Sequence, residues 1–105
     1  MNTYRMSPWQ VTTDPKLLRR MGKTIEEAGE LVNVAGRVII QGIDEIDPGT
    51  GKSNRARLLD ELADMQAQID CTCQLLFSSN EDSLYFHERL RRKKANMADW
   101  EAQVS

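Results

Sequence analysis

Apolar and small side chains recur every three or four residues through the first half of the chain. The series runs Leu18, Met21, Ile25, Ala28, Val32, Ala35 and Ile39. Such an alternation is typical of a helix that packs one face against other helices. Asp14 and Pro15 supply a start signal, because Asp is a favourable N-cap and Pro fits the first helical turn. We therefore predict one helix of about 27 residues that ends near Gly42.

Two further helices are predicted downstream. The second extends from Ser53 or Asn54 to about Phe77. Its apolar series is Leu58, Leu62, Met65, Ile69, Thr72 and Leu76. The third follows a capping box formed by Ser79 and Asp82. Its looser apolar face carries Phe86, Leu90, Met97 and Trp100. No segment shows the alternation of a β-strand.

The loop between the first two helices sets the predicted fold. Residues 42–54 are rich in Gly, Pro, Asp and Asn, which break helices and favour turns. Two long helices joined by such a loop become antiparallel neighbours. We predict an all-α fold, in which an antiparallel hairpin and a third helix are completed as a helical bundle by oligomerisation. Residues 14–105 form this domain, and residues 1–13 form an arm whose Tyr4 and Trp9 pack on it.

Composition excludes several classes of protein. The 105 residues include 14 basic and 16 acidic side chains, which argues against a general nucleic-acid or membrane-surface binder. The first residues lack the apolar run of a signal peptide, so we expect a cytoplasmic protein. Cys71 and Cys73 would point to nearly opposite sides of a helix, which predicts reduced thiols rather than a disulfide.

Two acidic segments carry the candidate chemistry. Each places three carboxylates on one arc of a helix: Glu26, Glu27 and Glu30 on the first, and Asp60, Glu61 and Asp64 on the second. In an antiparallel hairpin the two arcs can face each other, and converging acids need protons or a cation. An all-oxygen site favours Mg²⁺ or Mn²⁺ over zinc. The alternative is a solvated charged face.

The surroundings of the first acidic arc leave two packing arrangements open. The arc lies roughly opposite the predicted apolar series, where a surface helix keeps its charges. However, Leu31, Val34 and Val38 flank it and could wall the acids with a second apolar surface. Glycines at 22, 29 and 36 form a stripe, which favours a tight helix crossing over a substrate contact.

Two other segments receive weaker functional assignments. Gly49-Thr50-Gly51-Lys52-Ser53 differs from a P-loop, since Ile46 stands where that motif needs glycine and no buried strand precedes it. Lys52 is then either a phosphate contact or a solvated loop lysine. His87 is a surface or core-edge histidine rather than a ligand.

The acid spacing resembles that of a known superfamily. Glu26-Glu27 with Glu30, followed on the next helix by Glu61 and Asp64, is similar to the metal signature of MazG-like, all-α nucleoside triphosphate pyrophosphohydrolases. The segments around these acids and the Asp-Pro-Gly-Thr-Gly-Lys-Ser-Asn-Arg loop are similar to small members often encoded by bacteriophages. The resemblance covers roughly residues 16–101. The acids are further apart in sequence than in typical members, because of the loop at 42–54.

The resemblance implies a Mg²⁺-dependent hydrolysis of a nucleoside triphosphate, ribo or deoxy, to the monophosphate and pyrophosphate. Four acids would bind Mg²⁺, or Mn²⁺ in its place. Glu26, as a fifth member of the catalytic site, would support them or hold a further ion. These four are Glu27, Glu30, Glu61 and Asp64. The assembly would be a homodimer or homotetramer without membrane or nucleic-acid polymer partners, located in the host cytoplasm if the protein is phage-encoded.

Substrate contacts are expected from basic and aromatic side chains. Lys23 precedes the acids by one turn and is the best candidate for a phosphate contact. Further candidates are Lys52 and a basic patch of Arg91, Arg92, Lys93 and Lys94, each equally compatible with surface charge. Trp9 could stack on a base or serve as a packing anchor.

Two rival functions remain open. One is a catalytically weak protein that binds or sequesters a nucleotide, or regulates a host enzyme. The other is a helical interaction module whose acids form only a charged face.

Overall fold

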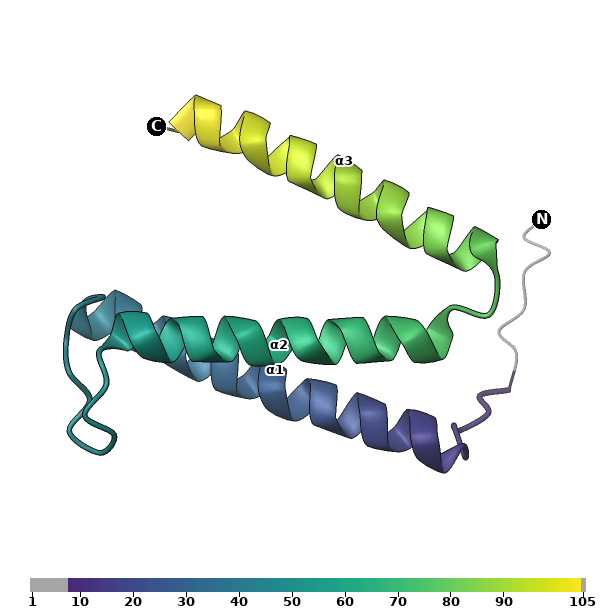
Figure 1. The fold of residues 1–105 in the computed structure, drawn as a ribbon, viewed down its shortest axis with the longest axis horizontal. Coiled ribbons are helices and arrows are strands. Elements are labelled where there is room, and N and C mark those ends of the chain that lie inside the picture. Colours follow the sequence, from purple (N-terminus) through teal and green to yellow (C-terminus); the bar gives the residue numbers. More distant parts are fainter. Residues whose placement is uncertain (1–7, 105) are drawn as a thin grey trace. The chain divides into compact units, whose positions relative to one another are not determined.

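The computed structural model describes residues 8–104, which form three helices and no β-strand (Figure 1). These are α1 (Pro15–Gln41), α2 (Asn54–Leu76) and α3 (Asn80–Val104). The all-α prediction and the bounds predicted for the first two helices are confirmed. Asp14 caps α1, since its side chain accepts a hydrogen bond from the Lys16 backbone N–H at 3.1 Å. Gly42 ends α1 with a φ of 98°, which favours glycine.

The chain divides into two compact units, residues 1–69 and residues 70–105. The first unit holds α1 and most of α2, which pack together as the predicted hairpin (Figure 1). The second unit holds the end of α2 and all of α3. No helix in the described part of the chain is long and apolar enough to cross a bilayer.

The packed face of α1 differs from the predicted one. Val34 is the fully buried apolar residue of the described chain, at 3% exposure, and Leu31 and Val38 on the same face are partly buried. Ile25, which belongs to the predicted core series, is 72% exposed. Val32 and Ile39 of that series are also largely exposed to solvent. The predicted series was therefore wrong as the intrachain core, because α1 carries two apolar stripes and α2 covers the one beside the acids.

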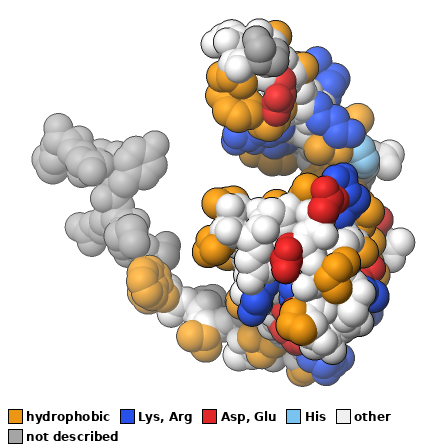
Figure 2. Space-filling model, turned by 90° about the vertical axis from the view of Figure 1, so that its left-hand side faces the viewer, with side chains coloured by type: hydrophobic (Ala, Val, Ile, Leu, Met, Phe, Trp, Pro, Cys, Tyr) orange, Lys and Arg blue, Asp and Glu red, His pale blue; other side chains and the backbone are white. Residues whose placement is uncertain are grey.

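Apolar side chains are consequently common on the surface, as the orange atoms in Figure 2 show. On α1 the open stripe is flanked by three glycines, and a Cβ added at any of them would meet nothing within 4 Å. The predicted tight crossing at these glycines does not occur within the described residues.

The connecting loop is tied to both helices by a buried side chain. Asn54 has no exposed surface, and its Nδ2 donates to the Gly42 carbonyl at 2.9 Å and to Gln41 Oε1 at 3.3 Å. Its backbone N–H donates to the Glu45 carbonyl at 2.8 Å. Ser53 caps α2 by accepting from the Ala56 N–H at 3.1 Å. These bonds join the end of α1 to the start of α2.

The second unit is held by a capped turn and a small aromatic cluster. Asp82 N–H donates to Ser79 Oγ at 3.3 Å, as expected for the first half of the capping box. The Asp82 carboxylate accepts from both the backbone N–H and the hydroxyl of Ser78, each at 2.9 Å. The Phe77 and Phe86 rings meet edge to face with centroids 5.6 Å apart.

Three other expectations concern single residues. Cys71 and Cys73 are free thiols, as predicted. Trp9 is 88% exposed, so its expected packing on the body is wrong. Tyr4 lies outside the described residues.

Candidate metal centre

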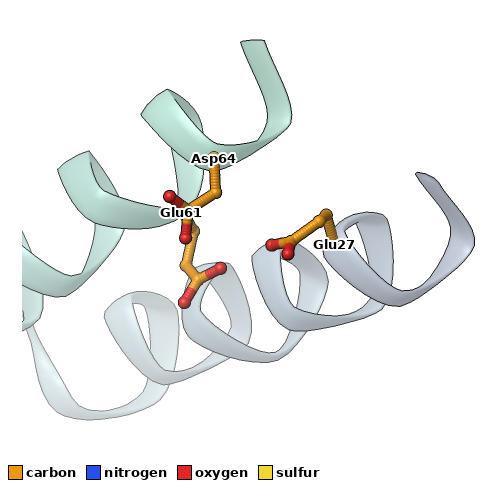
Figure 3. A group of neighbouring side chains, drawn as sticks. All are labelled: Glu27, Glu61 and Asp64. Atoms are coloured by element: carbon orange, nitrogen blue, oxygen red, sulfur yellow. The ribbon is translucent and has the colours of Figure 1, made fainter. Parts of the chain in front are cut away.

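Three carboxylates from two helices converge in the first unit. Glu27 comes from α1, and Glu61 and Asp64 come from successive turns of α2; one carboxylate oxygen of each lies within 4.8 Å of the others. Figure 3 shows the Glu27 carboxylate directed toward the two acids of the facing helix. The i, i+3 spacing on α2 places both of its acids on the same face. The prediction that the two acidic arcs meet is confirmed for these three residues.

The convergence leaves polar atoms without partners. Oε2 of Glu27 and Oε2 of Glu61 are both buried and accept no hydrogen bond in the described structure. The Glu27 side chain is 12% exposed. Buried carboxylate oxygens normally find a donor, a proton or a cation, because leaving them unpaired is costly.

The electrostatics of Glu27 and Glu61 also favour a proton or a cation beside these carboxylates. Burial raises the pKa of the Glu27 carboxyl above its ordinary value of 4.5, and the charges of Glu30 and Asp64 raise it further. Burial also raises the pKa of Glu61, followed by the charges of the same two residues. Both groups are thus easier to protonate than free glutamates. A cation between them would oppose both effects.

Glu26 and Glu30 lie at the edge of the cluster. Glu26 is exposed, and its Oε2 lies 3.4 Å from Lys23 Nζ. Glu30 is exposed and outside the group of three, yet its charge contributes to the raised pKa of both Glu27 and Glu61. Its negative charge therefore adds to that of the three acids.

Lys23 is the one predicted phosphate contact that the structure places at the acids. Its Nζ lies 3.9 Å from Glu27 Oε1, in addition to its contact with Glu26. An exposed lysine held in this way offers a positive charge one turn from the cluster.

Lys52 is engaged elsewhere. Its Nζ donates to Asp60 Oδ2 at 2.8 Å, and this hydrogen bond raises the pKa of the lysine. The pairing also explains Asp60, which points to the loop instead of joining the cluster. Sequence reasoning missed this contact, because Lys52 and Asp60 are eight residues apart across the start of α2.

The remaining predicted contacts are Arg91, Lys94 and Trp9. Arg91 and Lys94 belong to the second unit, where Arg91 Nη2 donates to Glu88 Oε1 at 2.7 Å. Lys94 and Trp9 are exposed. His87 Nδ1 hydrogen bonds to the Ser83 carbonyl at 2.7 Å, in agreement with a surface role.

A group of basic side chains on α1 escaped the sequence reasoning. Lys16, Arg19, Arg20 and Lys23 line one hollow together with Gly22. Their i, i+3, i+4, i+7 spacing is a helical face, and this signal would have identified the group before the structure.

No protein-family model matches this chain, and no curated protein or solved structure matches it. The relation to MazG-like enzymes stays a prediction drawn from the spacing of the acids.

Chemically, the cluster offers a small set of hard oxygen donors from three side chains. Mg²⁺ prefers such ligands and keeps part of its coordination shell for water and phosphate oxygens. The donor set of the three acids therefore fits a hard divalent cation.

Proposed function

We propose that this chain is a Mg²⁺-dependent nucleoside triphosphate pyrophosphohydrolase, with Mn²⁺ as an alternative ion. The observation that carries the proposal is the pair of buried, unpartnered oxygens of Glu27 and Glu61 beside Asp64. The resemblance of the acid spacing to MazG-like proteins supplies the nucleotide, since the acids alone argue only for a cation.

The residues have distinct proposed roles. Glu27, Glu61 and Asp64 hold the ion, and Glu30 adds negative charge beside them. When bound, the ion supplies charge neutralisation and a more acidic water. Lys23 orients a phosphate near the acids and offsets negative charge that develops during attack. Water adds to one phosphorus as a phosphoanhydride bond breaks, which gives a nucleoside monophosphate and pyrophosphate.

We also propose that the open stripe of α1 is covered by a second copy of the chain. Ile25, Val32 and Ile39 are exposed at a spacing of seven residues, a repeat that suits another helix. The flanking glycines present no Cβ and would let that helix approach closely. The resulting dimer or tetramer would complete the helical bundle.

Metal binding and turnover are tested separately. We expect Mg²⁺ or Mn²⁺ to raise the melting temperature of the wild type, because a ligand of the folded state stabilises it. Glu27→Gln and Glu61→Gln should abolish this rise, whereas Glu101→Gln, at an exposed acid of α3, should retain it. Pyrophosphate release is then screened with canonical and modified nucleoside triphosphates.

The outcomes distinguish the proposal from its rivals. Metal-dependent pyrophosphate release that is lost in both glutamate variants supports the enzyme. Tight nucleotide binding without turnover would identify a sequestering or regulatory protein. An unchanged melting temperature in both metals would leave an interaction module whose acids are a charged face.

A further inference from the structure

The basic hollow on α1 lies on the same helix as the acidic cluster and immediately before it. The hollow has a volume of about 540 Å³ and is lined by Lys16, Arg19, Arg20 and Lys23 among the described residues. At 100° per residue, the face that carries them continues into the face that carries Glu27. One side of α1 therefore changes from basic to acidic within a single turn.

Three of these cations have no anionic partner within the described part of the first unit. Among residues 8–69, no carboxylate lies within ion-pairing distance of the side chains of Lys16, Arg19 or Arg20. Arg20 is partly buried, which makes a guanidinium without such a partner more costly than one on an open surface. Four positive groups on one face repel one another, and an anion in the hollow would relieve this repulsion.

Lys23 joins the hollow to the acids. It lines the hollow and also lies within 3.9 Å of Glu27. From Lys16 to Lys23 the helix rises by about 10 Å, and Glu27 follows one turn later. A single phosphate could contact only part of this row, whereas a chain of phosphates could follow all of it.

We infer that Lys16, Arg19 and Arg20 bind the phosphate chain of a triphosphate whose metal-bound end lies at Lys23 and Glu27. This inference rests on the proposed metal site. The acids repel a bare polyanion and accept one that carries a divalent cation, so the combined site selects the metal complex. The acids, and a formal net charge of −2, disfavour the alternative of a nucleic-acid backbone.

The test uses inorganic triphosphate as the probe and isothermal calorimetry as the readout, with and without saturating Mg²⁺. Arg19→Gln/Arg20→Gln should weaken binding of the magnesium complex by at least about tenfold, because each arginine lost removes charge-assisted hydrogen bonds. Arg55→Gln/Arg89→Gln, at two exposed arginines, removes the same formal charge outside the hollow and should change affinity less than about threefold. Arg19→Lys/Arg20→Lys retains the charge and should recover most of the affinity, which excludes a folding defect.

A second calorimetric measurement tests whether the acidic cluster controls triphosphate binding in the hollow. In Glu27→Gln/Glu61→Gln, metal-free triphosphate should bind more tightly than to the wild type, because two repelling charges are gone. The advantage of Mg²⁺ should disappear at the same time.

Equal loss of affinity in the glutamine variant and its charge-matched control would overturn the inference, as would a wild type that does not bind triphosphate. Tighter, Mg²⁺-independent binding of a single-stranded oligonucleotide would overturn it in favour of a nucleic-acid surface. Each of these results is independent of the metal-induced rise in melting temperature, which decides the proposed metal site by itself.

Discussion

Asn54→Ala should destabilise the hairpin strongly, although the residue lies in neither the metal cluster nor an apolar core. The side chain is fully buried, and its Nδ2 makes hydrogen bonds of 2.9 Å to the Gly42 carbonyl and 3.3 Å to Gln41 Oε1. Each such bond contributes about 1 kcal/mol net, and truncation of a fully buried side chain adds the cost of the cavity that it leaves. We therefore expect the free energy of unfolding to fall by about 2–4 kcal/mol.

The assay is urea denaturation followed by circular dichroism, at one protein concentration so that any self-association contributes equally. Asn33→Ala is the matched control, because Asn33 is exposed within α1 and alanine is the better helix former. Its stability should equal or slightly exceed that of the wild type.

Asn54→Asp sharpens the test, since it keeps the shape of the side chain but replaces the Nδ2 donor with an acceptor. It should be at least as harmful as the alanine variant, because the new oxygen faces the Gly42 carbonyl and Gln41 Oε1. If Asn54→Ala lies within about 0.5 kcal/mol of the wild type, the loop is not anchored as described, and the side chain has no net stabilising effect.

Two further predictions concern pH and assembly. In EDTA, stability should rise as pH falls from neutrality toward 4.5, because the raised pKa values of Glu27 and Glu61 make the folded state bind protons more tightly than the unfolded state. Melting curves across pH should lose this trend in the double glutamine variant or with bound Mg²⁺; a wild type whose melting temperature is flat over this range would contradict it. Val32→Lys should convert the proposed oligomer to monomers in sedimentation experiments, whereas Lys93→Gln should not; an unchanged mass for Val32→Lys would exclude the α1 stripe as the interface.

Local sequence signals were sufficient to define the helices. Asp14-Pro15 at one end and Gly42 at the other bound α1, because each signal acts on backbone groups of its own helix terminus. The spacing of Glu61 and Asp64 likewise places both on one face wherever α2 packs. The convergence of the acids also followed from antiparallel pairing, since the loop at 42–54 leaves the two helices few other arrangements.

Which surfaces meet was decided only by the tertiary structure. α1 carries two apolar stripes, and its periodicity alone cannot state that α2 covers Val34 while Val32 stays open. The same choice brings Glu27 into the cluster and leaves Glu26 paired with Lys23 at the surface. Sequence spacing fixes where a side chain lies around its own helix, whereas the position of the neighbouring helix determines which side chains are buried and which acids lose their water.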